Sequence, residues 1–152
     1  LWSDGSYSWY CNTIPTPDGG THEAGLRLAL TRGLKNFAGM TGNRRAGELA
    51  GEDVFAGAEI MLSLFIRDPQ FQSQTKDRLT SPEATRLVEN AIKDHFDHWL
   101  TGNGERGKAL LAFVVERMED RLRRRQEALV KRKTATSKSS LRLPGKLTDC
   151  AR

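Results

Sequence analysis

Residues 6–37 read SYSWYCNTIPTPDGGTHEAGLRLALTRGLKNF, and this stretch decides the fold. Aromatic and polar residues alternate from Ser6 to Ile14, a pattern typical of a half-buried β-strand. Two prolines and the turn-forming sequence Asp18-Gly19-Gly20 end that strand. Thr21 is a suitable helix N-cap, and apolar residues then recur at helical spacing. The pattern predicts a helix from there to about Phe37.

Two later segments add further elements. Residues 59–67 are nearly all apolar, which predicts a strand that is buried on both faces or central in its sheet. Ser81-Pro82-Glu83 combines an N-cap serine, a proline at the first helical position and an acid, and predicts a helix to about Leu100. After a break at residues 101–104, apolar residues spaced by four and seven predict a longer helix over residues 105–133.

The remaining segments predict little regular structure. Residues 39–51 contain four glycines and mixed charges, and a short helix is expected over residues 52–58. Residues 70–80 are polar and lack a helical period, so we expect a loop. The helix over 105–133 would be roughly 43 Å long at ~1.5 Å per residue, so its far end must project or dock elsewhere. Residues 134–140 are rich in Ser, Thr and Lys, which is typical of a linker.

Length and composition exclude several classes of protein. The chain has 152 residues, 38% of them hydrophobic and 28% charged, which suits one domain or one domain with an extension rather than a disordered chain. No run approaches the ~20 apolar residues of a membrane helix, and the first residues lack the features of a secretory signal. Cys11 and Cys150 form neither a metal-type pair nor a disulfide framework, so we expect a cytoplasmic location.

The net charge of +5 is unevenly distributed. Residues 1–102 carry 10 basic and 13 acidic side chains, whereas residues 103–133 carry 10 and 5. This basic stripe indicates either a polyanionic partner or a solvated helix face, and its spacing does not separate the two. Its members are Arg121, Arg123, Arg124, Arg125, Lys131, Arg132 and Lys133.

Few patterns indicate chemistry. The sequence has neither a Walker phosphate loop nor a Ser–His–Asp arrangement. Residues 94–98 hold two histidines three positions apart, but without a third ligand they predict a half-buried helix face rather than a metal site. Gly19-Gly20-Thr21 could hold an anion on its backbone amides, although a turn with a helix cap is the simpler interpretation. Lys76 could reach a phosphate or simply be solvated.

Three motifs occur together in a specific order. Residues 11–16, CNTIPT, lead into residues 19–25, GGTHEAG. Residues 68–76, DPQFQSQTK, follow the apolar strand, and residues 143–150, LPGKLTDC, close the sequence. From about Ser8 to its end, the chain resembles the transducer domain of the ATPase (B) subunit of bacterial type IIA topoisomerases, that is, of gyrase and topoisomerase IV.

The resemblance implies an α+β fold similar to the second domain of ribosomal protein S5. This fold has a sheet with helices on one face and a left-handed crossover, here followed by a long projecting C-terminal helix. The implied divisions are a transducer core over 1–102, a long basic helix over 103–133, and a linker over 134–152 into a Toprim domain. In the family, a GHKL-type ATP-binding domain precedes the transducer. We expect neither of these flanking domains within the 152 residues.

The resemblance also implies roles for individual residues. Lys76 matches a family lysine that contacts the γ-phosphate of ATP across the domain boundary, and Gln74 matches the glutamine beside it. Arg27 matches an arginine of the cavity through which DNA passes. The basic helix matches the arm that runs toward the DNA gate, so DNA-facing roles are expected for Arg121, Arg123, Arg124 and Arg125. No catalytic residue or metal ligand is expected.

Three interpretations of function stay open. Residues 12–16 and 94–100 look more like the topoisomerase IV protein than gyrase B, and gyrase B is the alternative. Both imply ATP and Mg²⁺ bound mainly outside these residues, and no ATPase activity of this chain alone. Both also imply three partners: DNA, the A-type chain of topoisomerase IV or gyrase, and a second copy of the B-type chain. No membrane is expected. The third interpretation is a stand-alone nucleic-acid-binding protein with an S5-like fold.

Overall fold

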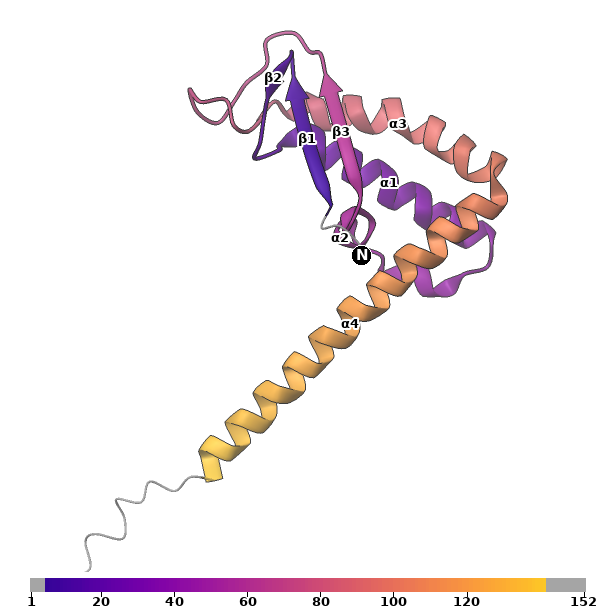
Figure 1. The fold of residues 1–152 in the computed structure, drawn as a ribbon, viewed down its shortest axis with the longest axis vertical. Helices are drawn as coiled ribbons and strands as arrows, with labels where there is room; N and C mark the ends of the chain where they lie inside the picture. Colours follow the sequence, from indigo (N-terminus) through magenta and orange to yellow (C-terminus); the bar gives the residue numbers. More distant parts are fainter. Residues whose placement is uncertain (1–4, 142–152) are drawn as a thin grey trace, which may run out of the picture. The chain divides into compact units, whose positions relative to one another are not determined.

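The structure is a computed structural model that describes residues 5–141, with side chains described as far as residue 135. The chain divides into two compact units, one ending at Met118 and the other beginning at Glu119. The boundary between these compact units lies inside the last helix. The elements are β1 (Ser6–Cys11), β2 (Ile14–Pro15), α1 (Thr21–Met40), the 3-10 helix η1 (Arg44–Glu48), α2 (Gly51–Phe55), β3 (Glu59–Leu64), α3 (Pro82–Gly102) and α4 (Gly104–Leu141) (Figure 1).

The single strand predicted from residue 6 to residue 14 is two strands joined by a tight hairpin turn. Cys11 pairs with Ile14 in antiparallel register. The two residues between them, Asn12 and Thr13, have φ angles of 49° and 67°. Positive φ at both central positions is what a type I′ turn requires, and asparagine tolerates it well. The turn carries no glycine, which is why the sequence did not signal it.

The sheet of the described residues has the order β2-β1-β3, with β1 and β3 parallel in the register Ser6↔Glu59 to Cys11↔Leu64. The Asn12 side chain prolongs this ladder, because its amide donates to the Ile66 carbonyl at 2.8 Å and accepts from the Ile66 amide at 2.9 Å. In Figure 1 both strands point up, β3 lies to the right of β1, and α1 lies behind them. The crossover from β1 to β3 is therefore left-handed, whereas crossovers between parallel strands of one sheet are nearly always right-handed. This confirms the fold that the resemblance implied.

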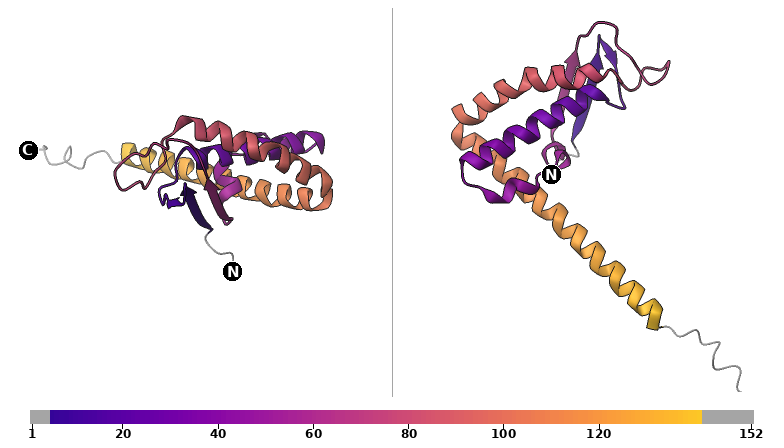
Figure 2. Two further views of the ribbon diagram at one scale, coloured as in Figure 1. Left: turned by 90° about the horizontal axis from the view of Figure 1, so that it is seen from above. Right: turned by 180° about the vertical axis from the view of Figure 1, so that it is seen from behind.

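The prediction that the second strand is buried on both faces or central is wrong. β3 lies at an edge of the described sheet and alternates between exposed and half-buried residues. Met61 is 75% exposed, and Phe65, just after the strand, is 71% exposed. Helices cover only one face of the sheet, as the view from above shows (Figure 2, left). The apolar run therefore contributes only alternate residues, Ile60, Leu62, Leu64 and Ile66, to the core.

The core lies between the sheet and the helices α1 and α3. Trp9, Leu26, Phe55 and Val88 form its centre. Gly25 lets the two helices approach closely, because a Cβ atom there would lie 2.4 Å from the carbonyl oxygen of Thr85. The helices run side by side in the view from behind (Figure 2, right).

The buried face of α3 differs from the predicted one. Leu87, Ala91 and Trp99 recur at helical spacing and would form one apolar face, yet the side chains of Leu87 and Trp99 are 50% and 39% exposed. The face that packs on the core instead runs through Ala84, Val88 and Leu100. Two faces of this helix carry apolar residues at helical spacing, and contact with Trp9 and Leu26 selects one of them.

The last helix is longer than predicted and leaves no linker over 134–141. α4 begins at Gly104, directly after Asn103, and runs to Leu141. Ser, Thr and Lys cost little in a helix interior, and the sequence holds no glycine or proline between Gly107 and Pro144. The Thr134 hydroxyl donates to the carbonyls of Val130 and Lys131 at 3.0 Å, as threonine does inside helices. The motif at 143–150 lies outside the described residues. No helix within residues 5–141 combines the length and apolarity needed to cross a membrane.

Candidate nucleotide-contact loop and basic surfaces

Residues 70–80, here called the 70–80 loop, form a narrow hairpin-like excursion between β3 and α3. Backbone hydrogen bonds join its two sides: Gln72 N–H to the Arg78 carbonyl at 3.0 Å and Thr80 N–H to the Gln70 carbonyl at 2.8 Å. At the tip, Lys76 N–H donates to the Ser73 carbonyl at 3.1 Å and closes a turn. The predicted loop is therefore correct, and it has a defined internal structure.

The base of this loop is attached to the start of α1. Leu79 N–H donates to the Gly19 carbonyl, and Thr21 N–H donates to the Leu79 carbonyl, both at 3.1 Å. Leu79 itself is 1% exposed and packs with Cys11 and Ala84. Asp18 N–H also donates to the Asp77 carbonyl at 2.9 Å. The loop and the N-terminus of α1 thus share one short backbone ladder.

Gln74 and Lys76 lie two residues apart in the turn at the tip, and both side chains are exposed. Lys76 adopts a positive φ of 59°. Its ammonium lies 5.7 Å from the centre of the Phe71 ring. Lys76 forms no ion pair with a carboxylate of the described residues, so its positive charge is available to an external anion. Thr75 and Asp77 support the turn, since the Thr75 hydroxyl donates to the Asp77 carboxylate.

The start of α1 is buried, and its cap differs from the predicted one. Gly20, not Thr21, is the N-cap, and its side-chain-free backbone lies against Leu79. His22 is fully buried beside Trp9, and its Nε2 atom lies 3.2 Å from the Thr16 hydroxyl. Burial lowers the pKa of this imidazole, and the neighbouring Glu23 carboxylate opposes the shift. His22 is therefore a neutral side chain that belongs to the buried packing at the start of α1.

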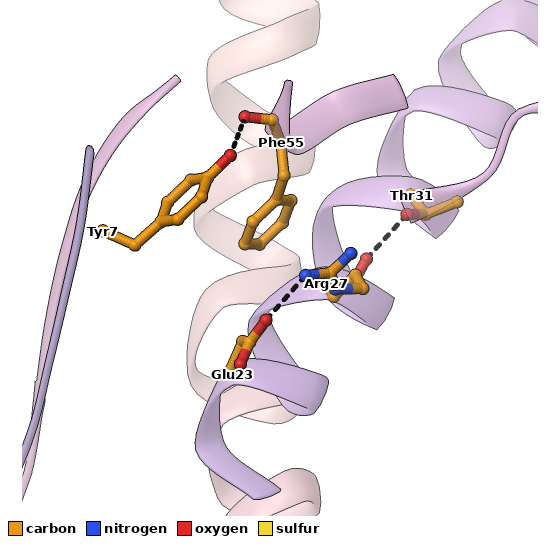
Figure 3. Close-up of polar contacts among 5 residues, drawn as sticks. All are labelled: Tyr7, Glu23, Arg27, Thr31 and Phe55. Carbon is orange, nitrogen blue, oxygen red and sulfur yellow. Dashed lines mark hydrogen bonds and ion pairs between the residues drawn. The ribbon is translucent and has the colours of Figure 1, made fainter. Parts of the chain in front are cut away.

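Arg27 is held by neighbours rather than pointing freely outward (Figure 3). Its guanidinium donates to the Glu23 carboxylate at 2.6 Å and lies 4.4 Å from the centre of the Phe55 ring. Phe55 is itself held by Tyr7, whose hydroxyl donates to the Phe55 carbonyl at 2.6 Å. The Arg27 side chain is 38% exposed, so only part of it faces solvent.

The four arginines predicted to face DNA lie on α4, in the unit that begins at Glu119. Arg123, Arg124 and Arg125 are exposed, whereas Arg121 is half-buried. Arg123 donates to the Asp120 carboxylate at 2.7 Å. Arg124 and Arg125 form no ion pair within the described residues. The available charge on this part of α4 is therefore greatest at Arg124 and Arg125.

The histidines of residues 94–98 do not form a metal centre. Both lie on α3, and His98 Nδ1 is 2.6 Å from the Asp94 carbonyl oxygen of the same helix. Within the described part of the chain, no group of three His, Cys, Asp or Glu side chains is arranged to hold a metal ion.

Comparison with known proteins identifies the family of the chain. The family model described as DNA gyrase B matches residues 2–129 of the chain. The chain belongs to the DNA gyrase B family. Within it, the chain is 58% identical to the B subunit of DNA topoisomerase 4 from Bartonella bacilliformis over 93% of its own length, and 52% identical to that from Caulobacter vibrioides over 97%.

Solved structures of this family share the fold. The topoisomerase IV ATP-binding domain of Francisella tularensis, solved with a small-molecule inhibitor, superposes with a TM-score of 0.74 at 28% identity. The superposition covers 80% of this chain and 34% of that one. The 43K ATPase domain of Thermus thermophilus gyrase B gives a TM-score of 0.71 at 27% identity, over 84% and 34%. The chain spans about a fifth of the length of the curated relatives, 20% and 21% for the two above.

Sequence reasoning missed several residues that shape the candidate site. Phe71 lies near the Lys76 ammonium, and Asp77 holds the turn through Thr75. Their polar or isolated positions carry no periodic signal. The sequence identified Gly20 only as part of a turn. In the structure, Gly20 forms a β-bridge with Leu79 and so joins the 70–80 loop to the start of α1. That role depends on Leu79, which is distant in the sequence.

Proposed function

We propose that this chain is the transducer part of a topoisomerase IV B protein. It couples ATP binding and hydrolysis in a preceding GHKL domain to DNA strand passage. Its partners in the cytoplasm are DNA, the A-type chain of topoisomerase IV and a second copy of the B-type chain. Membership of the family supports the general role. The curated relatives at 52% and 58% identity, both named for topoisomerase 4, favour this enzyme over gyrase.

The observation that carries the proposal is the tip of the 70–80 loop. It presents Lys76 and Gln74 to solvent, with no carboxylate of the described residues paired to the ammonium. These donors suit the γ-phosphate of ATP, which a lysine binds as a point charge. As the resemblance to the family implies, we assign ATP and Mg²⁺ mainly to the preceding domain. In the full enzyme, the bound nucleotide holds the loop tip, and the ladder at Gly19 and Leu79 passes any displacement to α1.

DNA contacts are the second part of the proposal. Arg124 and Arg125 are exposed without ion pairs in the described residues and suit phosphate contact. Arg121 and Arg123 lie on the same helix, and Arg123 must leave Asp120 to contribute fully. The ion pair with Glu23 offsets part of the Arg27 charge, so Arg27 would offer a phosphate only the guanidinium N–H groups that Glu23 does not bind.

The test uses the full-length B protein carrying Lys76→Ala. A charge-assisted hydrogen bond is worth about 1.5–3 kcal/mol, so ATP turnover should fall by ~10-fold or more. ADP affinity should hardly change, because ADP has no γ-phosphate. Gln74→Ala should give a smaller loss, since a neutral donor is weaker.

Arg78→Ala is the matched control, because Arg78 is an exposed cation of the same loop on one of its sides rather than at its tip. It should hydrolyse ATP as the wild type does. Steady-state hydrolysis and ADP titration measure both quantities. Equal turnover of the wild type and the Lys76→Ala and Gln74→Ala variants would remove the loop from the nucleotide site.

A further inference from the structure

A groove of about 430 Å³ lies between α1 and α3, on a surface to which no role has been given above. Its floor is made of small buried residues of α1, Ala29 and Gly33. At Gly33 the absence of a side chain matters, because a Cβ atom there would lie 2.6 Å from the Phe96 ring. α1 and α3 are therefore close together at Gly33, and longer polar side chains of both helices line the groove around this position. We call this feature the α1/α3 groove.

Three cations from both helices line the α1/α3 groove: Arg32, Arg86 and Lys93. Arg86 and Lys93 are exposed, and neither forms an ion pair with another described residue. They lie seven residues apart on α3, which is about 10.5 Å at ~1.5 Å per residue. The groove thus carries available positive charge at two separated positions along its length.

Arg32 lies across from α3 and pairs with the Glu89 carboxylate. The Glu89 side chain is only 16% exposed, whereas that of Arg32 is 64% exposed. The pair therefore neutralises the carboxylate and still leaves guanidinium N–H groups available, because a guanidinium has five donors and one carboxylate binds two of them in a bidentate pair. The anionic side chain that remains in the lining is Asp97.

Neutral donors complete the lining. Asn36 of α1 and Asn90 of α3 both line the groove and are exposed. Asparagine amides, arginine and lysine are the groups that commonly bind phosphate oxygens of nucleic acids. The polar and charged side chains of the lining are exposed or half-buried, so the groove is accessible to an extended ligand along its length.

We propose that the α1/α3 groove binds the phosphodiester backbone of DNA, independently of base sequence. Over the ~10.5 Å between Arg86 and Lys93, a duplex carries about six phosphates at one charge per ~1.7 Å. An extended polyanion can therefore satisfy the separated cations and the central Arg32 together. This rests on the proposed function and adds a DNA-contact surface in the first compact unit, separate from the arginines of the second.

The experiment is a fluorescence-anisotropy titration of a labelled DNA duplex with the full 152-residue chain at several salt concentrations. The groove variant is Arg86→Ala/Lys93→Ala. The control variant, Lys35→Ala/Arg106→Ala, removes the same charge from two exposed residues that do not line the groove. A third variant, Arg124→Ala/Arg125→Ala, reports on the α4 contacts. Circular dichroism verifies that each variant is folded.

The groove variant should bind more weakly at every sequence, and the slope of log K against log salt should become shallower by about 1.8, which is ~0.9 for each of two lost phosphate contacts. The control should keep the wild-type slope. A groove variant that binds like the wild type overturns the proposal, and so does an equal loss in both the groove and control variants, since that would reflect net charge alone. Competition by polyglutamate as effective as competition by unlabelled duplex would assign the groove to an acidic protein partner and overturn the DNA assignment.

These outcomes separate the groove from the proposed function. If the α4 variant alone loses affinity, the groove is wrong and the DNA role stands. If the wild-type chain does not bind DNA, both the groove and the α4 contacts fail, whereas the nucleotide contact at Lys76 is still decided by ATP turnover in the full-length protein.

Discussion

Gly20 connects the 70–80 loop to α1, and Gly20→Ala is the sharpest test of that connection. The residue has φ 138° and ψ −152°, a region open essentially only to glycine. A Cβ atom there would lie 2.2 Å from the carbonyl oxygen and 2.7 Å from the amide nitrogen of Leu79. Because these are backbone atoms of a buried residue, no side-chain rotation relieves the overlap.

The expected loss follows from these contacts. The backbone conformation costs an alanine about 1–3 kcal/mol. Displacing Leu79 also weakens two hydrogen bonds, Thr21 N–H to the Leu79 carbonyl and Leu79 N–H to the Gly19 carbonyl, worth about 0.5–1.5 kcal/mol each. The total is about 2–6 kcal/mol, a large part of the ~5–15 kcal/mol that stabilises a typical domain.

Urea unfolding followed by circular dichroism measures this loss. With a slope near ~2 kcal/mol per M, the midpoint should fall by about 1–3 M. Gly39→Ala is the control, because Gly39 lies in α1 with no atom within 4 Å of an added Cβ. It should leave stability unchanged or raise it by up to ~1 kcal/mol. If Gly20→Ala unfolds at the wild-type midpoint, the ladder between loop and helix does not exist as described.

Three further predictions concern buried or paired groups. Burial lowers the pKa of His22 in the folded state below the ordinary 6.5, so the unfolded chain takes up the proton first. The free energy of unfolding should therefore fall as the pH drops below about 6.5, and His22→Gln should flatten this fall in pH-dependent urea unfolding. Burial raises the pKa of the Cys11 thiol, so mass spectrometry should find its peptide unmodified by iodoacetamide in the folded chain and modified in urea. Arg27→Ala should lower the unfolding free energy by only about 1 kcal/mol, since its ion pair with Glu23 and its contact with Phe55 are partly exposed; a loss above about 3 kcal/mol in urea would show that Arg27 holds α2 in place.

Local signals predicted the starts of the main helices. Ser81-Pro82-Glu83 marks the first residue of α3 correctly, although the Ser81 hydroxyl accepts from the Gln70 amide at 2.8 Å instead of capping the helix. The glycine-rich turn before α1 was also located. Both starts depend on residues adjacent in the sequence, which is why a pattern can identify them.

Which face of each helix or strand packs against the core was harder to predict. Apolar periodicity within one element does not identify the residues of the other elements that contact it. Residues 59–67 have the composition of a fully buried strand, yet helices cover only one side of β3, and Met61 faces solvent. In α3, Val88 rather than Leu87 meets the core because Trp9 and Leu26 lie there. The sequence did not reveal the α1/α3 groove either, because its lining residues come from two helices that are distant in the sequence.

The candidate nucleotide site shows the same division between local and distant information. No periodicity distinguishes Lys76 from any solvated loop lysine, so resemblance alone selected it. The structure adds a physical reason for the choice: Leu79 is buried, and it pairs through its backbone with the residues that start α1. The base of the loop is held firmly, because displacing it would expose Leu79 and break its two backbone hydrogen bonds to Gly19 and Thr21. A displacement of the exposed tip is therefore transmitted to α1 rather than lost in movement of the base. The loop therefore suits a sensor whose displacement reaches α1.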